Sequence, residues 1–295
     1  MEELKRLVKR PYAIAVIIAA VAIVAAWYFL RAPFHIAPGT GGTQDVLAGA
    51  HFYRNSGISI ENVVVKLFYA VPRNKVSSAY PQWKQVLEDA ARKLSAFHKL
   101  QFRNTSSLRF DIFPRPVFLE HDNLFYDTVS TNFGNPHALI GVGEEIERRV
   151  FREGGDLYDG TFAVSAAHEY PVMGIVYEGV GAAGGVIWES GLGSLEEVAK
   201  ELQIPKEMIF QVGIEGTDGF FLLNRQFLTD FSYKPYGATL LYHEFAHTLG
   251  VPDRYDASSQ TDEAFSDDIM GGRRREPIEG NYLSAQLLKD LGVFK

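Results

Sequence analysis

The sequence predicts an α+β domain with a mixed sheet, preceded by one N-terminal transmembrane helix. Three observations lead to this fold class. A long apolar segment lies near the N-terminus, strand-like and helix-like segments alternate after it, and an amphipathic helix lies late in the chain. The chain has 295 residues, which is enough for one sizeable hydrophobic core.

The apolar segment is residues 11–30, PYAIAVIIAAVAIVAAWYFL, which contains no charged side chain. A helix of this length spans about 30 Å, the thickness of a bilayer core. Basic residues precede it, so we expect a single-pass protein of the cell membrane, with its N-terminus cytoplasmic and its folded part extracytoplasmic. The alternative is a cleaved signal peptide and a secreted protein, although the bulky run WYFL stands where small residues are usual.

Four regions follow: a basic cytoplasmic N-terminus (1–10), the transmembrane anchor (11–30), a flexible linker (31–44) and one folded domain (45–295). Residues 1–31 carry a net charge of +3, and since the whole chain carries −7, the other 264 residues carry −10. This acidic body argues against nucleic acid as a partner, because phosphate binding needs a basic surface. The chain has no cysteine, which excludes disulfides and cysteine-ligated metal sites.

Residue patterns in the folded domain predict both strands and helices. Segments rich in β-branched and aromatic residues are typical of strands, at residues 58–71, 108–112, 171–180, 185–188 and 219–223. Apolar residues spaced three and four apart, or a capping box, indicate helices, at residues 81–100, 141–152, 194–202 and 236–249. Strands and helices that mix in this order indicate an α+β domain.

The predicted helix at 236–249 carries the chemistry. Its apolar side chains form one stripe that faces the core: Ala238, Leu241, Tyr242, Phe245, Ala246 and Leu249. His243 and His247 lie one turn apart on another face, so both imidazoles can bind one metal ion. Glu244 is rotated by about 100° from His243, which places its carboxylate beside the metal, where it can accept a proton from water.

A third ligand is predicted just after this helix. Gly250 tolerates the left-handed conformation that ends a helix, and Pro252 prevents the helix from resuming. The resulting turn brings Asp253 to the metal, and three protein ligands with one open position are typical of catalytic zinc. Glu263 and Glu276 are alternative third ligands, and the plainest alternative is a helix with two surface histidines.

The stretch HEFAHTLGVPD resembles the long zinc signature of metzincin metallopeptidases, HExxHxxGxx(H/D). Its aspartate version, followed by RYD, is most similar to snapalysin-like and immune-inhibitor-A-like bacterial peptidases. SDDIMGG, with Met270, resembles the Met-turn beneath the metal in those enzymes, and residues 281–293 resemble the helix that follows it. The resemblance covers about residues 238–293 and implies a zincin-like (metzincin) catalytic domain with a long active-site helix and Zn²⁺ as cofactor.

One position departs from this pattern. Several metzincins have a tyrosine two residues after the Met-turn methionine, whereas this chain has Gly272. Tyr282 and Tyr255 are therefore the candidates for the group that stabilises the oxyanion. Further acidic residues follow the zinc motif, and they form either a solvated loop or a Ca²⁺ site: Asp253, Asp256, Asp262, Glu263, Asp267 and Asp268.

The resulting hypothesis is a membrane-anchored zinc metallopeptidase, specifically an endopeptidase, that hydrolyses protein or peptide substrates outside the cytoplasm with Glu244 as general base. We expect the substrate to extend along a strand edge, at residues 171–180 or 185–188. Two alternatives remain: an anchored, non-catalytic binding module on a zincin scaffold, and a zinc hydrolase that acts on a non-protein substrate.

Overall fold

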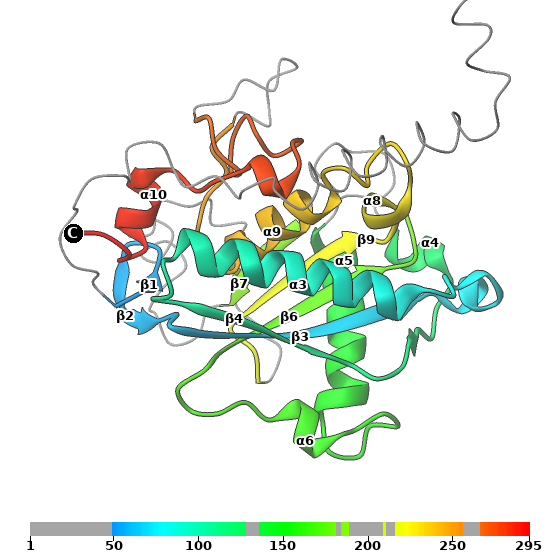
Figure 1. Ribbon diagram of the computed structural model, residues 1–295. Coiled ribbons are helices and arrows are strands. Elements are labelled where there is room, and N and C mark those ends of the chain that lie inside the picture. The colour runs from blue at the N-terminus through cyan, green and yellow to red at the C-terminus, as the bar shows by residue number, and fades with distance from the viewer. Residues whose placement is uncertain (1–48, 128–135, 181–183, 189–208, 211–215, 256–265) are drawn as a thin grey trace, which may run out of the picture.

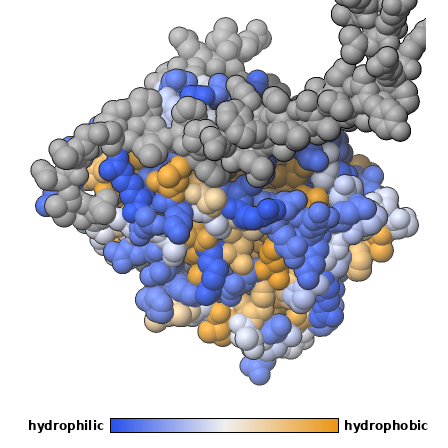
Figure 2. Space-filling view, viewed as in Figure 1, coloured by the Kyte–Doolittle hydropathy of each residue, from blue (hydrophilic) through white to orange (hydrophobic). Residues whose placement is uncertain are grey.

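The computed structural model describes residues 49–127, 136–180, 184–188, 209–210, 216–255 and 266–295 (Figure 1). The predicted N-terminal region (1–10), anchor (11–30), linker (31–44) and helix at 194–202 lie outside these residues. On the face that Figure 2 shows, hydrophilic residues cover most of the described surface, and smaller apolar areas lie between them, as is usual for a folded domain.

The described strands form a hairpin and one seven-stranded sheet. The hairpin is β1 (His51–Phe52) with β2 (Asn55–Ser59), and its strands are antiparallel. The sheet has the order β4-β3-β6-β9-β7-β8. The short strand β5 pairs with the last two residues of β3, after the part of β3 that pairs with β4. The strands of the sheet are β3 (Asn62–Val71), β4 (Ser107–Ile112), β5 (Val117–Phe118), β6 (Tyr170–Tyr177), β7 (Gly184–Trp188), β8 (Ile209–Phe210) and β9 (Gly219–Asn224).

The sheet is mixed, as predicted. β3 runs parallel to β4, β5 and β6, and β6 runs parallel to β9, whereas β7 is antiparallel to β9. The expected substrate edge is wrong for β6, which lies between β3 and β9; β7 pairs with β9 on one side and, on the other, with β8 at Ile187 and Trp188 alone among the described residues. Strand order depends on contacts between distant segments, so it could not be derived from the composition of these two strands.

Helices cover both faces of the sheet (Figure 1). On one face lie α3 (Trp83–Gln101), α9 (Gly237–His247) and, beyond them, α10 (Ala285–Asp290); on the other lie α5 (Pro136–Ile146) and α6 (Gly160–Ala163). Short helical segments complete the list: η1 (Arg73–Ser78), α4 (Asn123–Tyr126), the π-helical η2 (Glu147–Phe151), α8 (Gln226–Thr229) and η4 (Ile278–Gly280).

The sheet separates two hydrophobic cores, and the two faces of β3 contribute to one each. Alternate residues Val65, Leu67 and Tyr69 pack toward α3 and α9, while Phe68 and Ala70 pack toward the opposite helices. This alternation is what a strand with both faces buried requires. The predicted helix at 81–100 is confirmed as α3. Residues of β3, α3 and α9 belong to one apolar cluster, so the sheet supports α9 through this layer.

The predicted fold class needs one correction, since it included a membrane-spanning helix. Within the residues that the structure describes, no helix is both long enough and apolar enough to cross a membrane. The longest of these helices, α3, has 19 residues but is amphipathic, with Leu87, Leu94 and Phe97 buried and charged residues such as Lys84 and Glu88 exposed.

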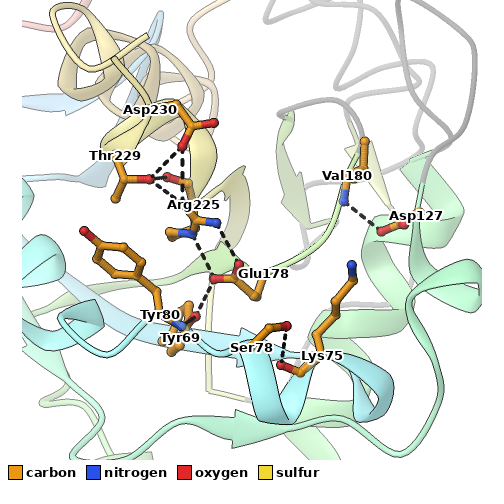
Figure 3. Close-up of polar contacts among 10 residues, drawn as sticks. All are labelled: Tyr69, Lys75, Ser78, Tyr80, Asp127, Glu178, Val180, Arg225, Thr229 and Asp230. Carbon is orange, nitrogen blue, oxygen red and sulfur yellow. Dashed lines mark hydrogen bonds and ion pairs between the residues drawn. The ribbon is translucent and has the colours of Figure 1, made fainter. Parts of the chain in front are cut away.

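An ion pair and a tyrosine tie together the carboxyl ends of three parallel strands, β3, β6 and β9 (Figure 3). Arg225 after β9 donates to both carboxylate oxygens of Glu178 after β6, at 2.8 and 2.9 Å. The Tyr69 hydroxyl of β3 donates to the same carboxylate. Both partners of the ion pair are at most 16 % exposed, and Arg225 immediately precedes α8, so this network restrains the chain where α8 begins.

The α9 helix ends close to where the sequence predicted. Its last residue is His247, and Gly250 has φ of +83°, in the left-handed region that side chains disfavour. A Cβ atom on Gly250 would lie 2.4 Å from Cε1 of the buried Phe52 ring in β1. The chain after β1 holds the same turn through Tyr53, whose N–H donates to the Leu249 carbonyl at 3.0 Å.

We predict that Gly250→Ala lowers the free energy of unfolding by about 2–4 kcal/mol, because it combines left-handed strain with the displacement of Phe52. Gly154→Ala is the matched control, since Gly154 has φ of +91° and a Cβ atom added there would meet nothing within 4 Å. It should lose only about 1–2 kcal/mol, from the strain alone. Urea unfolding of the metal-free proteins measures both, and equal losses would contradict the assigned contact.

Candidate metal centre

His243, His247 and Asp253 meet at the carboxyl end of α9. One potential ligand atom from each lies within 4.8 Å of the other two. Asp253 Oδ1 is 3.0 Å from His243 Nε2 and 3.4 Å from His247 Nε2. The two imidazole rings are 4.8 Å apart and nearly perpendicular, so their Nε2 atoms converge on the carboxylate. The structure therefore brings together the three residues that the sequence singled out as metal ligands.

Backbone carbonyl groups fix the orientation of both imidazoles. His243 Nδ1 donates to the carbonyl oxygen of Ile269 at 3.0 Å, and His247 Nδ1 donates to that of Val251 at 2.7 Å. A proton on Nδ1 leaves the Nε2 lone pair available in the neutral ring. Hydrogen bonds of this kind are the usual support of metal-ligating histidines, and both here direct Nε2 toward Asp253.

The donor atoms fit a tetrahedral zinc ion. At zinc–ligand distances of about 2.0–2.1 Å, tetrahedral geometry separates the donors by about 3.3 Å. The observed separations of 3.0 and 3.4 Å bracket this value. Two nitrogens and one carboxylate oxygen are also ligands that zinc accepts, and the 37 % exposure of Asp253 leaves one side of the group open to solvent.

The charges at this site are strongly coupled. Burial alone would lower the pKa of His247, but the negative charge and the hydrogen bond of Asp253 outweigh it and raise the pKa to about 9. For Asp253, burial opposes ionisation, yet the charge of His247 and the two imidazole hydrogen bonds hold the carboxyl pKa well below its usual range. The metal-free site therefore retains a proton that a bound cation must displace.

Glu244 lies beside this group without belonging to it. Its side chain is 9 % exposed, and burial raises its pKa, against the opposing charges of His243 and His247. It makes no hydrogen bond or ion pair to any other residue among those described. A buried carboxylate without such a partner, beside three potential metal ligands, is suited to proton transfer.

Met270 lies on a turn that contacts both sides of the site. Its side chain is fully buried, and its carbonyl oxygen accepts a hydrogen bond at 2.9 Å from the N–H of Arg254, the residue after Asp253. The preceding residue, Ile269, supplies the carbonyl that orients His243. The structure thus places the predicted Met-turn residue on a turn that bonds His243 and the residue after Asp253.

The structure distinguishes the two tyrosines. The Tyr255 ring lies 6.0 Å from the His243 ring, and the Arg274 guanidinium covers it at 3.9 Å. The Tyr282 hydroxyl is instead directed to Asp267, to which it donates at 3.2 Å, and Tyr282 is 7 % exposed. Of the two candidates for stabilising an oxyanion, Tyr255 is the one that the structure places against a predicted metal ligand.

The other acidic residues near the zinc motif lie in different environments. Glu276 is 48 % exposed and pairs with Arg273, outside the His243 group. Asp268 is fully buried among hydrogen-bond donors and has no open carboxylate for Ca²⁺, whereas Asp267 is exposed and accepts one hydrogen bond, from Tyr282. Glu263, Asp256 and Asp262 lie outside the described residues.

Sequence reasoning missed several residues that support the site. The Tyr170 hydroxyl, at the start of β6, donates to the Thr248 carbonyl at 2.6 Å and holds the end of α9. His98 of α3 is fully buried, with its ring nitrogens 3.0 Å from the Tyr242 hydroxyl and 2.7 Å from Ser106 Oγ. Burial lowers the pKa of His98 to about 3, so it is neutral and serves to join α3 to α9.

No protein-family model matches the chain, and no curated protein matches it. The resemblance to metzincins therefore depends on the motif residues themselves, and family membership stays a prediction.

We predict that zinc affinity falls as the pH is lowered. His247 has a pKa of about 9 in the metal-free protein, so below that pH a zinc ion must displace its proton. One displaced proton weakens the apparent affinity about tenfold for each pH unit lost. Competition with a chromophoric chelator between about pH 6 and pH 8.5 measures this slope. A flat dependence would contradict the assigned charge state.

Proposed function

We propose that the protein is a zinc-dependent peptidase in which His243, His247 and Asp253 hold the metal and Glu244 is the general base. The observation that carries this proposal is the convergence of the three potential ligand atoms, with the buried Glu244 carboxylate beside them and not bonded to any other described residue. The likeness of HEFAHTLGVPD and Met270 to the zinc signature and Met-turn of metzincin peptidases supports the peptide bond as the substrate.

Each residue has a defined part in hydrolysis. When bound, zinc supplies Lewis acidity, which lowers the pKa of a water molecule and polarises the scissile carbonyl. Glu244 accepts a proton from the water that attacks the carbonyl carbon, and then returns it to the nitrogen of the leaving amine. Its raised pKa suits both roles, because a group that accepts and then releases a proton works best near the ambient pH.

Tyr255 is the candidate for binding the developing oxyanion. Its ring lies 6.0 Å from that of His243, and the Arg274 guanidinium stacks on it at 3.9 Å, which restrains it. A hydroxyl donor held in place stabilises negative charge without reorganising during the reaction. In this proposal Tyr255 takes the role for which several metzincins use a tyrosine at the position of Gly272.

Glu244 also bears on the alternative functions. A site in which metal served structure alone would have no need for a buried carboxylate beside the ligands, since such a group costs free energy when it ionises without a partner. A zinc hydrolase of another substrate class would use the same groups. Substrate class must therefore be tested by the products formed.

The test is hydrolysis of a peptide library by the full-length chain, followed by mass spectrometry, with esters and simple amides in parallel. We predict peptide cleavage that a zinc chelator abolishes and that added zinc restores. Glu244→Gln should lower kcat/KM by about 10²–10⁴-fold, the usual contribution of a positioned base. Its zinc affinity should change little, because Glu244 is not a ligand.

Two results would contradict this proposal. If the zinc-bound Glu244→Gln variant kept full activity, Glu244 could not be the general base. If the protein hydrolysed esters or simple amides but no peptide, it would be a zinc hydrolase of another substrate class.

The identity of the third ligand has its own test. We predict that Asp253→Ala weakens zinc binding by at least about 100-fold, since it removes one of three ligands and the charge that favours a cation. Glu276→Gln is the control, because this rival ligand pairs with Arg273 at the surface, and its affinity should match that of the wild type. Equal losses in both variants, measured by chelator competition, would reject Asp253 as the ligand.

A further inference from the structure

Asp268 is a fully buried carboxylate on the turn that contains Met270. The sequence predicted that Asp268 belongs either to a solvated loop or to a Ca²⁺ site. Neither interpretation explains a side chain with no exposed surface. A buried carboxylate is retained only where hydrogen bonds and opposite charge compensate for the loss of water. The partners of Asp268 therefore indicate what it holds in place.

One carboxylate oxygen of Asp268 fixes the turn that orients His243. Oδ1 accepts a hydrogen bond from the N–H of Met270 at 3.1 Å and from Ser266 Oγ at 2.7 Å. Ile269 lies between these contacts, and its carbonyl oxygen accepts the Nδ1 proton of His243 at 3.0 Å. Asp268 thus bonds the chain on both sides of Ile269, the residue whose carbonyl orients the imidazole.

The other oxygen reaches the segment that carries Asp253. Oδ2 accepts from the N–H of Ser284 at 3.2 Å and lies 3.5 Å from Nη1 of Arg254. The same Nη1 donates to Ser284 Oγ at 2.7 Å. The backbone of Arg254 is bound as well, since its N–H donates to the Met270 carbonyl at 2.9 Å. Arg254 immediately follows Asp253, so the chain just after this ligand is held on two sides.

We propose that Asp268 is a positioning residue for the metal centre: by fixing the Met270 turn and Arg254 together, it holds His243 and Asp253 in the geometry that binds zinc. This inference rests on the proposed function, in which those residues are zinc ligands. Asp268 does not touch the ligand atoms. It acts through the Ile269 carbonyl on one side and through Arg254 on the other.

The test is Asp268→Asn in the full-length chain. The amide keeps the size of the side chain, but whichever way it lies, its NH₂ group faces a donor, either Met270 N–H or Ser284 N–H and Arg254. We expect the zinc dissociation constant to rise about 10–100-fold, the usual effect of losing a group that orients ligands. The visible spectrum of the cobalt-substituted protein should change as well, since it reports ligand geometry independently of activity.

Asp267→Asn is the matched control. It removes the same charge from the neighbouring residue, whose carboxylate accepts a hydrogen bond from Tyr282 and none from the Met270 turn. Its zinc affinity should therefore stay within about threefold of the wild type, because an exposed charge that makes no hydrogen bond to the Met270 turn has a small effect. A loss in Asp268→Asn alone then reports lost positioning rather than lost charge. Thermal unfolding of the metal-free proteins shows whether each variant is folded.

A folded Asp268→Asn protein with wild-type zinc affinity and cobalt spectrum would overturn this inference while leaving the proposed function intact. Equal weakening in both variants would overturn it too, since charge alone would then explain the effect. If Asp268→Asn does not fold, zinc affinity is measured in Arg254→Met instead. The Arg254 side chain is 30 % exposed, and methionine keeps its aliphatic part while removing the guanidinium. Unchanged affinity in Arg254→Met would reject the inference, and weaker affinity would support it. Wild-type protein that binds no zinc would reject both proposals.

Discussion

The hydrogen bond from His243 Nδ1 to the Ile269 carbonyl joins the two segments on which the site depends. His243 belongs to a helix that packs on the sheet, whereas Ile269 belongs to the irregular chain that follows the third ligand. Neither segment could position a metal ion alone, because the helix offers two imidazoles and the loop one carboxylate. The bond makes the orientation of one predicted ligand depend on how the other segment folds, and metal-ligating histidines are usually oriented by such bonds.

Local sequence predicted what depends on local geometry. The helix at 237–247 and the common face of His243 and His247 follow from a period of 3.6 residues, and the turn at Gly250 follows from its freedom to adopt positive φ. The supporting groups were missed, because the carbonyls of Ile269 and Val251 belong to the backbone and carry no residue-type signal. The strand order, which places β6 in the middle of the sheet, depends on contacts between distant segments and could not be predicted.

The scaffold and the site place opposite demands on buried polar groups. His98, Tyr242 and Ser106 satisfy one another inside the core, so they stabilise the contact between α3 and α9 as neutral groups. Glu244 is buried on the same helix and lacks such a partner among the described residues, which raises its pKa. A protein selected for stability alone would pair or replace this carboxylate, so its presence beside the converging ligand atoms favours a chemical role.

The account depends most directly on which atoms surround the metal. X-ray absorption spectroscopy at the zinc edge, on full-length protein loaded with one equivalent of zinc, reports this without any assay of activity. We predict a four-coordinate zinc with two imidazole ligands and the rest oxygen, as His243, His247, Asp253 and one water would give. A six-coordinate, all-oxygen environment without imidazole scattering would contradict the account, because zinc would then lie elsewhere on the acidic surface.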